Sequence, residues 1–337
     1  MVWRAIFDTV KLPLQAAGLR LGQARSWMGR SSWRRARART GHELAGAAAD
    51  PAVPDYKKVV ESVFLRRSIE RQPLLVVLGD MEHFRSSPIW KSRRKARLFH
   101  CKALDEASDE ELQADSTRFI RWAPRSKYII SEKERNRVPK NRSIINDTHF
   151  SCSKRNVQVN FEKVFGYRLS VDPLGETGSC VRKSDRNAVH DGRVILLPVA
   201  EIEPNVVYEK IVDNECGHDL VYDIRLPVFG PVSPYCIVKL REKSMRFGRT
   251  NVVSFLLPAS SLLDSEEISL CRSFAKEIGL DFGELDVLRD GQSGKIYIVD
   301  ANNTPVGPSQ SLSAEERSHA IKLYAQHFSN SFFGTKY

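Results

Sequence analysis

Asp286, Asp300 and Asn302 are the residues of this sequence whose types and spacing best suit a metal ion. They lie in two β-rich runs that flank a glycine-containing turn at residues 290–294, which is typical of an antiparallel hairpin. Asp300 and Asn302 are two positions apart, so their side chains share one face of a strand. Carboxylate and amide oxygens are hard ligands that suit Mg²⁺ together with phosphate oxygens. The hairpin therefore predicts a site for a metal and a nucleotide.

The register of this hairpin decides whether the two carboxylates meet. If Asp290 pairs with Ile296, the ladder places Asp286 directly opposite Asp300, with both side chains on one face. Like charges opposed across a strand pair are destabilising, so this register requires a compensating cation. The alternative is a solvated hairpin whose acidic side chains face water.

The order Asp286, then Asp300-Ala301-Asn302, then a turn of Pro and Gly resembles the C-terminal metal hairpin of the ATP-grasp superfamily. The resemblance covers about residues 150–310. It implies that Asp286, Asp300 and Asn302 hold magnesium ions that bridge the phosphates of ATP. It also implies an ATP-dependent ligase, which phosphorylates a substrate carboxylate to an acyl phosphate that an amine or other nucleophile attacks. The expected cofactors are ATP and Mg²⁺, and the expected partner is a small-molecule or peptide carboxylate.

Lys183 ends a β-rich run and precedes a polar loop at residues 184–192. This layout resembles the ATP-grasp strand whose lysine contacts the phosphates of ATP beneath a flap, and lysine is a natural partner for phosphate. Flaps of this superfamily are usually rich in glycine, because backbone N–H groups must approach oxygen closely. This loop contains one glycine. Arg186 or His190 could replace the missing contacts, or could be ordinary solvated loop residues.

The segment that contains Glu209 and Lys210 resembles the connection between the two lobes of an ATP-grasp protein. The resemblance implies that Glu209, Lys210 and Val212 serve the adenine base. A nearby acid, Asp213 or Glu215, would serve the ribose. An amphipathic edge strand would have the same pattern without binding a nucleotide.

Arg225 and Lys239 supply cations on two further predicted strands. Phosphoryl transfer requires positive groups around the γ-phosphate, and the bidentate donors of arginine suit that role. We therefore expect Arg225 and Lys239 to be catalytic. The alternative is surface ion pairing with Asp219 or Asp223.

The elements that must position these residues fall into two halves. Up to about residue 170, helices at 56–68 and 156–165 alternate with strands at 74–78 and 128–130, which implies an open α/β unit. Beyond residue 172, closely spaced strands and two capped helices imply an α+β half dominated by antiparallel sheet. The strands are expected at 179–183, 193–199, 206–212, 220–229, 235–240 and 251–257, and the capped helices begin at Asp264 and Ser313.

The fold class is therefore a combination of α/β and α+β, an ATP-grasp-like two-lobed nucleotide cleft preceded by a small α/β domain. The predicted units are a basic N-terminal extension (1–54), an α/β domain (55–170), a small ATP-grasp lobe (171–212) and a large ATP-grasp lobe with the metal hairpin (213–337). A chain of 337 residues is long enough for this arrangement.

Residues 1–50 contain nine Lys and Arg and three acidic residues. Their net charge of +6 is more than half of the net charge of +11 of the whole chain. Apolar residues between positions 2 and 14 recur at near-helical spacing, and tryptophans follow at 27 and 33. The segment could therefore lie on an anionic membrane surface through residues 1–40, or be a solvated flexible extension. A basic tail that bound nucleic acid or membrane would show a steep dependence on salt.

The six cysteines lack metal-binding spacing, and no apolar run approaches the roughly 20 residues that span a bilayer. We therefore expect a cytoplasmic protein. Aromatic residues are too sparse along the basic body to favour a specific nucleic-acid partner. Two other functions stay open: a phosphotransferase that uses the same nucleotide cleft to act on a hydroxyl, and a non-catalytic nucleotide-binding protein, which the glycine-poor flap favours.

Overall fold

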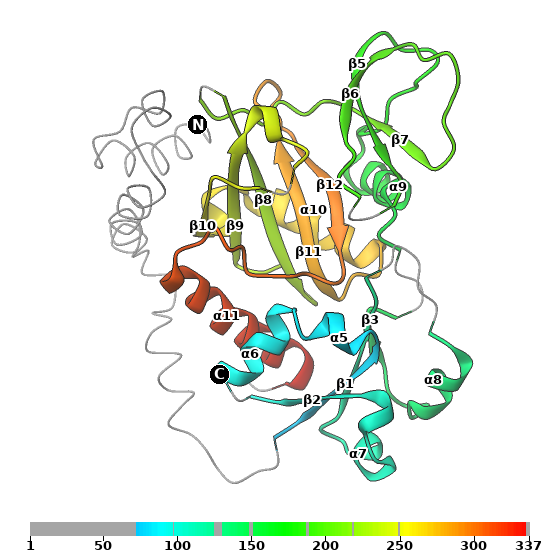
Figure 1. The fold of residues 1–337 in the computed structure, drawn as a ribbon, viewed down its shortest axis with the longest axis vertical. Helices are drawn as coiled ribbons and strands as arrows, with labels where there is room; N and C mark the ends of the chain where they lie inside the picture. The colour runs from blue at the N-terminus through cyan, green and yellow to red at the C-terminus, as the bar shows by residue number, and fades with distance from the viewer. Residues whose placement is uncertain are drawn as a thin grey trace.

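A computed structural model describes residues 72–334 except 97, 125–129, 148–150, 187–188, 218 and 249. Within them the chain forms a four-stranded, a five-stranded and a three-stranded sheet (Figure 1). The N-terminal extension, the helix expected at 56–68 and most of the strand expected at 128–130 lie outside the described residues. The predicted fold class, with parallel and antiparallel sheets in one chain, is confirmed.

The first sheet is parallel, with the strand order β2-β1-β3-β4. Its strands are β1 (Leu74–Gly79), β2 (His100–Ala103), β3 (Arg118–Trp122) and β4 (Ile144–Ile145). The helices around it are α5 (Met81–Phe84), α6 (Pro88–Ala96), α7 (Asp109–Gln113) and α8 (Glu132–Arg137). β1 is buried from Leu74 to Leu78, as an apolar run between two covered faces should be. This confirms the strand predicted at 74–78.

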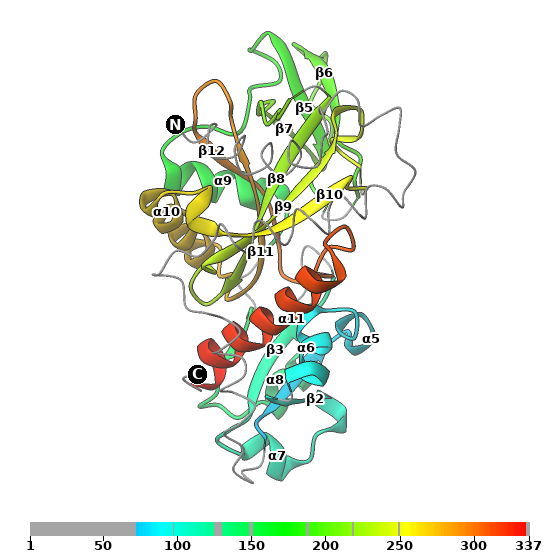
Figure 2. The same ribbon diagram turned by 90° about the vertical axis from the view of Figure 1, so that its left-hand side faces the viewer.

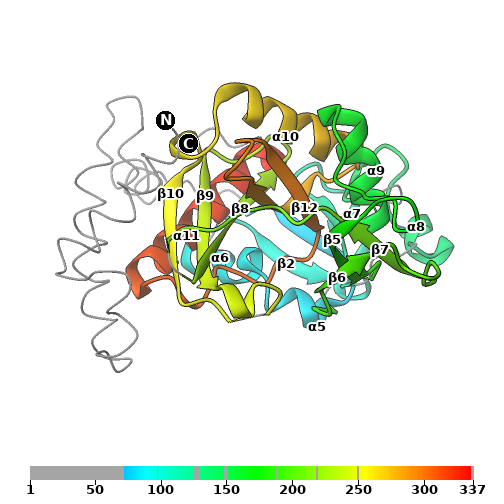
Figure 3. The same ribbon diagram turned by 90° about the horizontal axis from the view of Figure 1, so that it is seen from above.

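The second sheet is antiparallel, with the order β10-β9-β8-β11-β12. Its strands are β8 (Leu220–Phe229), β9 (Tyr235–Glu242), β10 (Val253–Pro258), β11 (Phe282–Arg289) and β12 (Ile296–Asn302). Two helices, α9 (Lys154–Phe165) and α10 (Ser265–Glu277), share a hydrophobic core with this sheet (Figure 3). Both predicted caps are confirmed, since the side chains of Ser153 and Asp264 accept hydrogen bonds from backbone N–H groups of the first helical turn.

One face of the five-stranded sheet is apolar and the other carries charged side chains. Along β8, Ile224 and Leu226 belong to the core shared with the two helices, so Arg225 between them projects from the opposite face. Lys239 and Asp286 lie on the charged face as well, because both form ion-pair contacts there. This charged face is the surface on which the candidate site is built.

The third sheet is small, with the order β6-β5-β7. Its strands are β5 (Gly178–Ser184), β6 (Arg193–Leu197) and β7 (Val206–Glu209). β6 ends before Pro198, and β7 ends three residues before its predicted end because the N–H of Lys210 donates to the carbonyl of Leu169. In Figure 2 this sheet lies at one end of the molecule and the parallel sheet lies at the other.

The last helix, α11 (Ala314–Phe328), joins the parallel sheet to the five-stranded sheet (Figure 2). Its N-terminus is a capping box formed by Ser313 and Glu316, as predicted. Tyr324 and Phe328 share one core with residues of β1 and β3 and with Phe229 and Phe282 of the five-stranded sheet. The C-terminal helix therefore holds two of the sheets together.

The hairpin of β11 and β12 contains an irregularity that the sequence did not reveal. Ile296 pairs with Arg289, so the predicted pairing with Asp290 is wrong by one residue. A bulge between positions 286 and 287 of β11 then gives β12 one extra residue, and Asp286 lies opposite Asp300 as predicted. The predicted pairing of Asp286 with Asp300 is confirmed, but the register of the ladder shifts by one residue between the turn and this pair.

Candidate functional site

A cavity of about 1340 Å³ lies between the small sheet and the charged face of the five-stranded sheet. Lys183 of β5 lines it from one side and Asp286 of β11 from the other. His83 of α5, which follows a strand of the parallel sheet, also contributes to the lining. All three sheets or their adjoining segments therefore meet at one cavity.

Asp286, Asp300 and Asn302 line this cavity together. Within the part of the chain that the structure describes, no three His, Cys, Asp or Glu side chains gather to hold a metal on their own. The available donors are thus two facing carboxylates and an amide oxygen, a set of hard oxygens that fits Mg²⁺ when phosphate or water oxygens complete the coordination. Asn302 Oδ1 is oriented by the N–H of Thr304, which donates to it at 3.0 Å.

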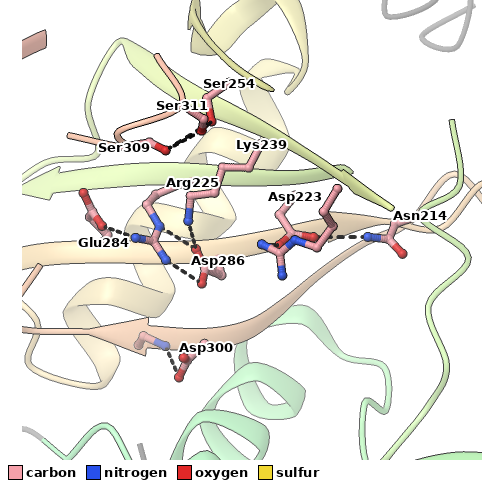
Figure 4. A network of polar contacts seen from close by, with 12 residues as sticks. Asn214, Asp223, Arg225, Lys239, Ser254, Glu284, Asp286, Asp300, Ser309 and Ser311 are labelled. Atoms are coloured by element: carbon pink, nitrogen blue, oxygen red, sulfur yellow. Dashed lines mark hydrogen bonds and ion pairs between the residues drawn. The ribbon is translucent and has the colours of Figure 1, made fainter. Parts of the chain in front are cut away.

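Arg225 is clamped between two carboxylates (Figure 4). Its Nε and Nη2 donate to Asp286 Oδ1 at 2.8 Å and Oδ2 at 3.0 Å, and its Nη1 lies 3.0 Å from Glu284 Oε2. Glu284 is buried and also accepts a hydrogen bond from the hydroxyl of Tyr324. Although burial would raise the pKa of Asp286, the charges of Arg225 and Lys239 hold that pKa well below its usual range.

Lys239 is a buried cation whose nearest carboxylate, that of Asp286, lies beyond hydrogen-bond distance. Only 6% of the residue is exposed, and its Nζ lies 3.7 Å from Asp286 Oδ1. Burial, and then the like charge of Arg225, lower the pKa of Lys239 to about 8. Its ammonium group would therefore be stabilised by an anion entering the cavity.

Lys154, which the sequence did not single out, completes the charge around the metal hairpin. Its Nζ lies 3.1 Å from Asp300 Oδ1, and it is the first residue of α9. Burial opposes its charge, but the attraction of Asp300 outweighs burial and raises the pKa of Lys154. The capping of this helix by Ser153 was predicted, but the contact of its first residue with β12 was not.

Lys183 and Glu209 contact each other at the edge of the small sheet. Lys183 Nζ lies 2.5 Å from Glu209 Oε2 and donates to the carbonyl of Val299 at 3.1 Å. Glu209 is almost fully buried, and burial raises its pKa against the attraction of Lys183. Its Oε1 has no hydrogen-bond partner among the described residues. A buried unpaired acceptor on a cavity wall is a place where a ligand donor would be favourable.

Lys210 and Val212 also line the cavity. The side chain of Lys210 does not point freely into it, because its Nζ lies 3.0 Å from Asp290 Oδ2 and donates to the hydroxyl of Tyr297 at 3.1 Å. This contact ties the segment after β7 to the turn of the hairpin.

Asp213 and Glu215, the residues expected near a ribose, lie outside the lining of the cavity, while Asn214 between them belongs to it. Glu215 Oε1 pairs instead with Lys243 Nζ at 2.5 Å. Asn214 Oδ1 accepts a hydrogen bond from Arg246 at 2.9 Å. The alternation of side chains along this extended segment explains why neighbouring residues face different directions.

The predicted flap covers one wall of the cavity through His190, Asp191 and Gly192. Its single glycine has a packing reason, because a Cβ at Gly192 would lie 2.8 Å from Cδ1 of Phe247. Phe247 belongs to the connection after β9, so the flap touches the five-stranded side of the cavity directly. Arg186 is exposed and lies outside the lining.

No family model matches the sequence, and no curated protein matches it. Similar solved structures include the ATP-grasp ligase PsnB complexed with a minimal precursor, which is 12% identical with a TM-score of 0.46 over 77% of this chain and 98% of that chain. The VanG D-Ala:D-Ser ligase from Enterococcus faecalis is 10% identical, with a TM-score of 0.48 over 77% of this chain and 99% of that chain.

A RimK domain protein ATP-grasp from Sphaerobacter thermophilus is 11% identical, with a TM-score of 0.41 over 78% of this chain and 99% of that chain. The names of PsnB and of the RimK domain protein contain the term ATP-grasp, the superfamily that the hairpin sequence resembles. A likeness at this identity and TM-score leaves the chemistry to be decided by the residues of this chain. Among the described helices, none has the length and apolar character needed to cross a membrane.

Proposed function

We propose that this chain is an ATP-dependent ligase of the ATP-grasp type, which activates a carboxylate as an acyl phosphate. One observation carries the proposal: Asp286 and Asp300 face each other across two strands at the wall of a large cavity, and cations surround them. Lys154 contacts Asp300, and Arg225 and Lys239 contact Asp286. Such a cluster of opposite charges suits phosphate groups together with their metal ions.

Asp286, Asp300 and Asn302 would hold Mg²⁺, which would offset the negative charge of the phosphate groups. Lys183 would contact the phosphates from the small sheet. The unpaired Oε1 of Glu209 favours a donor such as an amino group of the base. The cavity lining supports roles for Lys210 and Val212 beside the base, and it favours Asn214 over Asp213 or Glu215 for the sugar.

The proposed reaction has two steps. A carboxylate oxygen of the substrate attacks the γ-phosphorus of ATP, the bond from that phosphorus to the β–γ bridging oxygen breaks, and ADP leaves. An amine nitrogen then attacks the acyl carbon, the bond from that carbon to the phosphate oxygen breaks, and inorganic phosphate leaves while the amine proton passes to solvent. Arg225 and Lys239 would offset the charge on the oxygens of the transferred group.

Thermal unfolding with and without ATP and Mg²⁺ tests this proposal. ATP with Mg²⁺ at about 100 times the dissociation constant should stabilise the wild type by roughly 2.7 kcal/mol. Asp300→Asn should lose most of this ligand-induced shift, whereas Asp105→Asn, which changes an exposed acid far from the cavity, should retain it. A folded wild type that shows no shift at millimolar ATP would contradict the proposal.

A non-catalytic nucleotide-binding protein is a second candidate, because the flap has one glycine to approach phosphate oxygens. Release of ADP in the presence of mixed carboxylates and amines separates the two. The ligase proposal expects ADP release to require a carboxylate and sustained turnover to require an amine as well, and product analysis would distinguish it from phosphate transfer to a hydroxyl. A protein that responds to ATP and Mg²⁺ in thermal unfolding but forms no ADP would be the non-catalytic form.

A further inference from the structure

Glu284 is a carboxylate on the charged face of β11 that the proposed reaction does not use. Its side chain is 1% exposed, compared with 22% for Asp286 and 25% for Asp300. Its Oε1 accepts a hydrogen bond from the hydroxyl of Tyr324, and a Cβ added at Gly307 would lie 3.6 Å from the same oxygen. The carboxylate of Glu284 is therefore enclosed by protein on the side of the cavity.

The neighbour through which Glu284 can act is Arg225. The guanidinium of Arg225 lies between Glu284 and Asp286, with Nη1 at 3.0 Å from Glu284 Oε2 (Figure 4). This Oε2 has no hydrogen-bond partner among the described residues, so the contact depends on opposite charge. The side chain of Arg225 is 22% exposed and lines the cavity. A ligand in the cavity would contact Arg225, whose position depends on Glu284.

Asp286 has two positive neighbours before any ligand binds. Arg225 donates to both of its oxygens, and Lys239 Nζ lies 3.7 Å from Oδ1. A Mg²⁺ ion held by the hairpin would be a third positive neighbour, and cations that share one carboxylate repel one another. The attachment of Arg225 to Asp286 should therefore weaken when the metal is bound.

Glu284 supplies a negative charge that stays with Arg225. It lies two residues before Asp286, which is roughly 7 Å along the strand. One of its oxygens accepts from Tyr324 and the other faces Arg225, so neither is directed at the hairpin. We propose that Glu284 is a positioning residue, which holds the guanidinium of Arg225 beside the transferred phosphoryl group while Asp286 binds the metal. This inference rests on the proposed ligase function.

A carboxylate so close to the hairpin could instead be a further metal ligand. Glu284 is paired with Asn302 in the ladder of β11 and β12, which places their Cβ atoms roughly 5 Å apart. The enclosure of Glu284 favours the positioning role, because a metal ligand must present an oxygen to the ion. The two roles differ in a measurable way, since the positioning role requires Arg225 and direct metal binding does not.

The test measures the dissociation constant of a non-hydrolysable ATP analogue by calorimetric titration of the full chain at constant ionic strength. Each titration is done with EDTA and with saturating Mg²⁺. Glu284→Gln removes the charge at nearly constant shape, and Glu284→Asp keeps the charge but withdraws it from Arg225. Both changes are also made together with Arg225→Gln. Glu267→Gln is the matched control, because it breaks a Glu–Arg ion pair with Arg289 that lies outside the cavity lining.

We expect Glu284→Gln to weaken binding at least five-fold with Mg²⁺. With EDTA its affinity should stay within two-fold of the wild type or become tighter, because loss of a negative charge by itself favours an anionic ligand. Glu284→Asp should lose at least two-fold with Mg²⁺ but less than Glu284→Gln, and it decides the question alone if Glu284→Gln does not fold. Neither change should weaken binding further when Arg225→Gln is present, and Glu267→Gln should match the wild type.

Wild-type affinity of both Glu284 variants with Mg²⁺ would overturn the positioning role, and so would equal losses with and without Mg²⁺, which indicate a general structural effect. A loss that persists together with Arg225→Gln would make Glu284 a metal ligand instead. In these cases the wild type still binds the analogue with Mg²⁺, so the proposed function stands. A folded wild type that does not bind it would overturn the proposed function and the positioning role together.

Discussion

Asp286 and Arg225 show how the chemistry of one side chain is set by a partner distant in sequence. The two residues are paired across β8 and β11, and two hydrogen bonds join their side chains. A bidentate contact of this kind fixes the plane of the carboxylate as well as its charge. Asp286 is thereby held ionised and oriented before any ligand arrives.

The buried positive charge of Lys239, which lines the cavity, should lower the free energy of unfolding of the protein. Its folded pKa of about 8 lies below the value of 10.5 that it has in an unfolded chain, so its charge costs free energy at pH 7. Lys239→Met should therefore raise the free energy of unfolding at pH 7, by up to the order of 3 kcal/mol. Between pH 8 and 10.5 the folded lysine is neutral and the unfolded one still charged, so the wild type gains stability with rising pH and the difference should shrink.

Urea denaturation of both proteins at pH 7 and pH 10 measures this effect. Ile237→Val, a neighbouring change on the same strand without a charge, serves as the control, and its difference in stability from the wild type should not depend on pH. A Met variant that is less stable than the wild type at both pH values would show that Lys239 contributes favourable pairing instead.

That Asp286, Asp300 and Asn302 lie together could be predicted because their types and the two-residue spacing of Asp300 and Asn302 are local. Lys154 and Glu284 were missed for different reasons. Lys154 meets Asp300 across 146 positions of sequence, which no local pattern records. Glu284 could have been found, because it lies two residues before Asp286 and therefore on the same face of β11.

Among the elements, the start of α9 has an influence on the site beyond its own stability. The Oγ of Ser153 accepts a hydrogen bond from the N–H of Asn156 at 3.3 Å and so fixes the first turn, where Lys154 lies. Ser153→Ala should cost roughly 1 kcal/mol of stability through loss of the cap. It should also weaken the thermal shift produced by ATP and Mg²⁺.

Ser108→Ala is the control, since the Ser108 Oγ that caps α7 beside the parallel sheet also accepts a hydrogen bond from a backbone N–H three residues on, at 3.2 Å. Both variants should lose similar free energy of unfolding in urea, and only Ser153→Ala should lose part of the ligand-induced shift. Equal ligand responses in the two variants would show that the orientation of Lys154 does not depend on the cap.

The longer capped helices α9, α10 and α11 and the strands with long apolar runs could be predicted, whereas β2, β3 and β4 could not. β3 contains Arg118 and Arg121 within five residues, and β4 has two residues. Such strands are set by pairing with β1 and not by their own composition. The hairpin register was predicted incorrectly near the turn for a similar reason, since a bulge arises from tertiary contacts.

At the scale of the whole molecule, α11 connects the core between two sheets with the charged cluster. The hydroxyl of the buried Tyr324 donates to Glu284, which in turn contacts Arg225. Tyr324→Phe keeps the ring in the core and removes one donor to a buried carboxylate. We expect a loss of about 1–3 kcal/mol in the free energy of unfolding.

Tyr297→Phe offers a comparison, because its hydroxyl contacts Lys210, a residue that is partly exposed. We expect that variant to lose less than 1 kcal/mol. Both are measured by chemical denaturation, and a Tyr324→Phe variant as stable as the wild type would mean that Glu284 is satisfied by Arg225 alone.

The bulge in the hairpin also has a consequence for how the protein could change over evolution. On β12, Ile296 and Ile298 precede the bulge and lie in the core. Asp300 follows the bulge and lies opposite Asp286. A related chain without the extra residue could form a regular ladder and still bring its two acids together. The number of residues between the acids can therefore differ by one among descendants of a common ancestor, and a sequence motif with a fixed interval would overlook some of them.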